Sequence, residues 1–183
     1  GRELPFYGSD LLAAVPGTRE GDEEARLNLA IAEAFYRLAE SDERQKTDEA
    51  ERRLRSAVRR ARRTGERDLL VLGFVVQSRR EIHEKSLREA RAAIHAGLEA
   101  AGDHRFRLFE CDLLCLEAEL SKRLAELSEA ENAARRALEI SREIAYPVGE
   151  IEALRKLAEL SRDLVEKPGL RKAAEERYEA FRT

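Results

Sequence analysis

The chain has 183 residues and a formal net charge of -3, enough length for one domain with a core of its own. Charged residues make up 39% of it and aromatic residues only 5%, with no Trp and no Met, a composition typical of helical proteins that leaves little room for strands. No apolar run approaches the roughly 18 to 20 residues that span a bilayer, and no secretory signal opens the chain, so we expect a cytoplasmic protein without membrane contact.

Residues 1–21 come first, with two prolines and no helical periodicity, and we expect a linker or cap there. From residue 22 onward, apolar residues recur at helical spacing. They predict helices near 22–41, 47–64, 68–84, 87–101, 104–125, 128–145, 148–165 and 169–182. Glycine commonly ends a helix and proline commonly opens one. Both stand between the expected helices, at Gly65, Gly102, Pro147 and Pro168-Gly169.

The expected elements repeat with a period of 40 residues. Small side chains form two of the repeating columns, one at Ala57, Gly97 and Ala137, the other at Ser78, Ala118 and Ala158. Because small side chains let helix axes approach closely, these columns predict helix pairs that stack in series. The chain then divides into a domain at 22–183 with four helix-turn-helix repeats, at about 22–65, 66–103, 104–146 and 147–183.

The stretch EAELSKRLAELSEAENAARRALEIS, with Ala118, Ala130 and Ala137 at its small positions, resembles the tetratricopeptide repeat family. RKLAELSRDLVEKPGLRKAAEERYEAF repeats the pattern, and the resemblance covers about residues 22 to 182. The period of 40 rather than about 34 resembles a long-repeat variant found in bacterial regulatory and sensor proteins. HEAT-like repeats share this length, and the small-residue columns favour the tetratricopeptide alternative. The resemblance implies an all-α fold, an α-solenoid with a right-handed superhelix.

The resemblance also implies a protein-protein interaction module, a scaffold whose first helices line a concave groove for a peptide or partner helix. Carrying the family's groove positions over to this chain gives five positions in each repeat, Glu119 and Glu159 among them. Of these, we expect the partner to bind at Leu29, Tyr36, Arg37, Leu72, Val75, Arg79, Ile82, His83, Lys122 and Arg123. Leu72, Val75 and Ile82 share one helix face and predict an apolar floor, so we expect a protein or peptide partner that is acidic and partly apolar.

Three alternatives stay open at this point. The charged groove positions could simply be a solvated surface. The groove could hold the chain's own N-terminal segment, through Phe6, Tyr7, Leu11 or Leu12. The chain could also be the regulatory sensor segment of a larger bacterial signalling protein, coupling ligand or partner binding to a linked effector domain.

One segment, 51–67, is strongly basic, with eight arginines against two glutamates. Five of these arginines fall at helical spacing and form a basic stripe: Arg52, Arg55, Arg59, Arg62 and Arg63. Such a stripe suits phosphates or an acidic protein surface. The acidic balance of the remaining chain and the lack of interleaved aromatic residues disfavour nucleic acid.

Few side chains suggest chemistry. Cys111 and Cys115 lie one helical turn apart, with His104 before them, but a structural zinc site needs four ligands and a Cys-x-x-Cys turn is absent. We therefore expect both thiols to lie in the core or to line the groove, and to be reduced. No phosphate-binding glycine loop or HExxH pattern is present, so we predict no catalytic residues, no metal, no cofactor and no enzyme activity.

Overall fold

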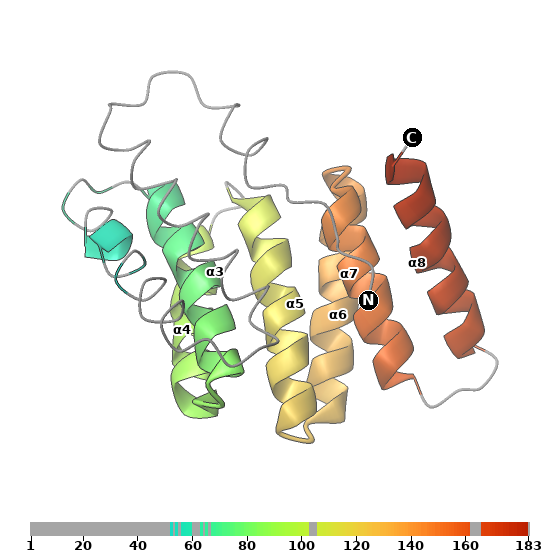
Figure 1. Ribbon diagram of the computed structural model, residues 1–183, viewed down its shortest axis with the longest axis horizontal. Helices are drawn as coiled ribbons and strands as arrows, with labels where there is room; N and C mark the ends of the chain where they lie inside the picture. Colours follow the sequence, from blue (N-terminus) through green and yellow to red (C-terminus); the bar gives the residue numbers. More distant parts are fainter. Residues whose placement is uncertain are drawn as a thin grey trace.

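The computed structural model describes residues 67–102, 106–161 and 166–182, together with residues 52, 54, 56–59, 63 and 65. These ranges are helical and contain no strand, which confirms the all-α prediction for them (Figure 1). Six helices are bounded there: α3 Arg67–His83, α4 Leu87–Ala101, α5 Arg107–Arg123, α6 Leu127–Glu143, α7 Pro147–Leu160 and α8 Glu166–Arg182. None of the described helices is long and apolar enough to cross a membrane.

The described helices lie in two rows (Figure 1). Each helix packs against the next one along the chain, and α3, α5 and α7 also contact one another in series. No such contact joins α4 to α6. The helices α3, α5 and α7 therefore lie closer to one another than α4 and α6 do. The exposed surface of these three helices is called here the α3–α5–α7 face.

Successive helices are joined by one type of turn, used three times in the described chain. Its central residue has a positive φ, 62° at Lys85, 62° at Ala125 and 53° at Ala145. The next backbone N–H bonds back to a carbonyl five residues earlier, as in the Schellman motif that closes helices. These bonds run from Ser86 to Glu81 at 2.9 Å, from Glu126 to Ser121 at 2.8 Å and from Tyr146 to Ser141 at 2.7 Å. The turns at 85 and 125 reproduce the 40-residue period of the sequence in the backbone.

Small residues stand where helices come closest. Ala118 and Ala137 are completely buried, as the columns of small residues predict. A Cβ added to Gly97 would lie 2.9 Å from both Leu113 Cδ1 and Phe74 Cβ, so the backbone of α4 approaches its neighbours too closely for any side chain there. The columns of small residues are therefore helix contacts, and larger apolar side chains fill the space between them.

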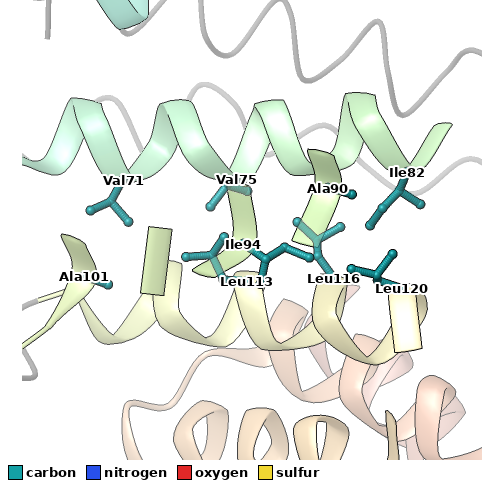
Figure 2. Packing of buried hydrophobic residues seen from close by; sticks show 9 residues of the cluster. All are labelled: Val71, Val75, Ile82, Ala90, Ile94, Ala101, Leu113, Leu116 and Leu120. Atoms are coloured by element: carbon teal, nitrogen blue, oxygen red, sulfur yellow. The ribbon is translucent and has the colours of Figure 1, made fainter. Parts of the chain in front are cut away.

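The largest core cluster lies between three helices. Figure 2 shows side chains from α3, α4 and α5 meeting in it. Its buried members are Val71, Val75, Ile82, Ala90, Ile94, Ala101, Leu113, Leu116 and Leu120. Because α3 has α4 against it on one side and α5 on another, two of its faces are covered.

Two expected boundaries are wrong. The helix expected to reach residue 165 ends at Leu160, and Ser161 has an extended backbone with ψ 125°. Pro168 and Gly169, expected between helices, lie inside the first turn of α8, which begins at Glu166. A proline is tolerated there because its missing N–H would have no partner in the first turn of a helix. Pro147 occupies the first position of α7, as expected.

Candidate functional site

The apolar floor expected for a groove is not exposed. Val75 is 0% exposed and Ile82 5%, and both belong to the core cluster of Figure 2. Leu72 is half-buried and packs against a second cluster that contains Leu69 and Val76. The prediction of Val75 and Ile82 as contact residues is therefore wrong, because α4 and α5 cover the face of α3 that carries them. Three other predicted groove residues, Leu29, Tyr36 and Arg37, lie outside the described residues.

The polar groove residues lie at the surface, at one end of the α3–α5–α7 face. His83 ends α3, and Lys122 and Arg123 end α5; all three are exposed, whereas Arg79, one turn earlier in α3, is half-buried. The guanidinium of Arg123 donates from Nη1 to the carbonyl oxygen of Ile82 at 2.9 Å. This bond joins the ends of α3 and α5 and sets Arg123 against Ile82, the residue before His83.

Three charged side chains, Lys156, Glu119 and Arg123, are joined by hydrogen bonds across the face, and this chain of bonds is called here the relay. Arg123 Nε donates to Glu119 Oε1 at 2.9 Å, and Lys156 Nζ donates to Glu119 Oε2 at 2.7 Å. The relay therefore runs from the C-terminal end of α3 through α5 to α7. Beside it, Lys122 Nζ donates to Glu159 Oε2 at 2.7 Å.

The relay is partly buried, which alters how its members titrate. Burial alone would raise the pKa of Glu119, but the hydrogen bond and charge of Lys156, followed by those of Arg123, lower this pKa to about 2. Burial would likewise lower the pKa of Lys156, and its hydrogen bond to Glu119 overcomes this and raises the pKa. The side chains of Lys156 and Glu119 are only 18% and 21% exposed, so the pair is a fixed part of the fold.

Sequence reasoning missed Lys156 as a member of this face. A signal for it exists, because Glu119 and Lys156 are 37 residues apart, as are Lys122 and Glu159. This separation is the 40-residue period less about one helical turn of 3.6 residues. In stacked repeats, residues 37 apart in the sequence can face each other on neighbouring parallel helices, so that opposite charges at these positions can pair.

Comparison with known proteins assigns no family to the chain. No protein-family model matches it, and neither a curated protein nor a solved structure does. The function is therefore argued from the residues of the chain, beginning with the α3–α5–α7 face, where Arg123 bonds to Ile82.

Another carboxylate of α5, Glu117, has charged neighbours on α4 and α6. Glu117 on α5 is half-buried, and the equivalent positions one period away are Gln77 and the buried Leu157. Burial raises the pKa of Glu117, against the charges of Arg136, Arg91 and His95, which lower it. Glu117 and its basic neighbours carry charges of both signs, so this group of side chains favours neither an acidic nor a basic ligand.

The two cysteines lie in the core, as expected from their type. Cys111 is 0% exposed and Cys115 3%, and the Cys111 thiol donates to the carbonyl oxygen of Ala137 at 3.4 Å. The hydrogen bond with Cys111, together with burial, raises the pKa of Cys115 well above its ordinary value, so this thiol stays protonated. In the described part of the chain, no three or more His, Cys, Asp or Glu side chains gather as a metal site would require.

The basic stripe is only partly described. Arg52, Arg59 and Arg63 are exposed, and Arg55 and Arg62 lie outside the described residues. Leu54 and Ala57, from the same helical segment, are buried against Leu69 and Val76 of α3. At 100° per residue, the three described arginines point away from that buried side. They belong to a surface separate from the α3–α5–α7 face.

Proposed function

We propose that the protein is an interaction module that binds an acidic segment of a partner protein on the α3–α5–α7 face. We also propose that its helices form a tetratricopeptide-like α-solenoid of four repeats with a right-handed superhelix. The recurring turns at Lys85 and Ala125, together with the completely buried Ala118 and Ala137, support the second proposal. A scaffold of this kind displays side chains on rigid helices, a suitable support for a binding surface.

The observation that carries the binding proposal is that Lys122 and Arg123 end α5 and that Arg123 bonds to the residue before His83, at the end of α3. The helices α3 and α5 bear basic residues in their last turns, and the Arg123 bond to the Ile82 carbonyl sets these turns side by side. Basic groups gathered at a surface attract acidic segments and speed their association. Since Val75 and Ile82 are buried, we expect affinity to come from charge more than from apolar contact.

The proposal is tested by fluorescence anisotropy with a labelled hexaglutamate peptide, and with a labelled hexalysine peptide as a charge-reversed probe. We expect the acidic peptide to bind, and its affinity to fall as salt is added. Lys122→Met should weaken binding, whereas the matched Lys172→Met should not. Lys172 is a suitable control because it is an exposed lysine paired with a glutamate on α8, away from the face. Equal affinity for both peptides, or equal loss in both variants, would contradict the proposal.

A further inference from the structure

The two cations that end α5 are held in different ways. Arg123 bonds to Glu119 within its own helix and to the backbone carbonyl of Ile82 on α3. The Ile82 carbonyl also accepts the backbone N–H of Lys85 at 3.2 Å, so the Arg123 bond is a second hydrogen bond to it. Among the described residues, Lys122 is held by one ion pair, to Glu159 on α7.

The Lys122–Glu159 pair is also more exposed than the Lys156–Glu119 pair, which likewise connects α5 with α7. Its side chains are 39% and 47% exposed, against 18% and 21% for Lys156 and Glu119. An ion pair in water contributes little net stability, because both ions are well hydrated when apart. A carboxylate that arrives from outside can therefore replace Glu159 on Lys122 at small cost, whereas it cannot easily replace Glu119.

We infer that Glu159 is an intramolecular competitor for the binding site, which occupies Lys122 in the free protein and is displaced when an acidic partner binds. This inference rests on the proposed function and adds a regulatory element to the same surface. The exchange conserves the number of ion pairs, since Lys122 gives up one carboxylate and gains another. Glu159 then lowers the affinity for every acidic segment, and it favours partners that offer more than one carboxylate to the cations at this end of the face.

The test compares Glu159→Gln with wild type in the hexaglutamate titration. The substitution removes the competitor and keeps the size of the side chain, so we expect affinity to rise by roughly twofold to fivefold, the range set by a surface ion pair. Glu176→Gln is the matched control, because Glu176 is an exposed glutamate paired with Lys172 on α8. The change in affinity caused by Glu176→Gln measures the general effect of removing one negative charge. We expect this change to be smaller than that caused by Glu159→Gln.

A double variant isolates the pair. When Lys122 is already replaced by Met, Glu159 has no lysine to occupy. Adding Glu159→Gln should then change the affinity no more than adding Glu176→Gln does. A gain that persists without Lys122, or one that equals the control, would overturn the inference and leave the proposed function standing. No binding of the acidic peptide to any variant would overturn both. Thermal melts check that these variants fold, which we expect because the substituted side chains of Lys122, Glu159 and Glu176 lie at the surface.

Discussion

The partly buried Glu119 gives the most quantitative prediction. The pKa of its carboxyl is about 2 in the folded chain, against an ordinary value of 4.5. A depressed pKa means that the charged form stabilises the fold. The stabilisation is complete above the unfolded pKa and is lost as the pH falls from about 4.5 toward 2.

The size of the effect follows from the shift. Each pKa unit corresponds to about 1.4 kcal/mol, so a fall from 4.5 to about 2 sets an upper bound of roughly 3 to 4 kcal/mol. Since 21% of the Glu119 side chain is exposed, water screens part of its interaction, and we expect about 2 kcal/mol. Glu119→Gln removes this contribution and leaves Lys156 without its hydrogen-bonded carboxylate.

The assay is urea denaturation of wild type and Glu119→Gln at several pH values between 7 and 3. The difference in unfolding free energy between them should be about 2 kcal/mol near pH 7, and more than half of it should disappear by pH 3. Glu176→Gln, which removes an exposed carboxylate, should stay within about 0.5 kcal/mol of wild type throughout. A Glu119→Gln difference that does not change with pH would refute the assigned role of the Lys156–Glu119–Arg123 relay.

Three further predictions concern packing and turns, and each is checked by thermal and urea denaturation. Gly97→Ala should destabilise the fold by about 1 to 3 kcal/mol, because its new Cβ would lie 2.9 Å from Leu113 and Phe74; an unchanged midpoint would mean that α3, α4 and α5 are less closely packed. Ala137→Leu, at a completely buried position, should have a similar effect, and a neutral result would contradict the assigned repeat register. Ala125→Gly should instead stabilise by about 0.5 to 1 kcal/mol, since φ is 62° there; a loss of stability would argue against the left-handed turn.

The spacing of apolar and small residues in the sequence predicted the helices well, but it predicted the residues of the binding groove poorly. The helix expected at 87–101 is found at those residues, and those expected at 104–125 and 128–145 are found at 107–123 and 127–143. These elements combine strong periodicity with small residues at fixed positions, so pattern and packing agree. The end of α7 was missed because residues 161–165 continue a helical pattern that the backbone at Ser161 does not follow.

The groove prediction failed at Val75 and Ile82 for a different reason. A sequence shows which side chains share a helix face, but not whether a neighbouring helix covers that face. Here α4 and α5 cover it. The charged residues Lys122 and Arg123 could be placed at the surface from their type alone, whereas their separate partners, Glu159 and Ile82, depend on how α3, α5 and α7 align.

The turns between helices restrict how the length of this chain can change. At each of the three turns, the residue that completes the closing motif of one helix is also the residue that precedes the next: Ser86, Glu126 and Tyr146. No spare residue lies between the two helices. A one-residue insertion there would move the closing bond of one helix away from the start of the next and so change how the two helices pack. Length variation among relatives of this protein should therefore avoid these turns and occur in whole helix pairs.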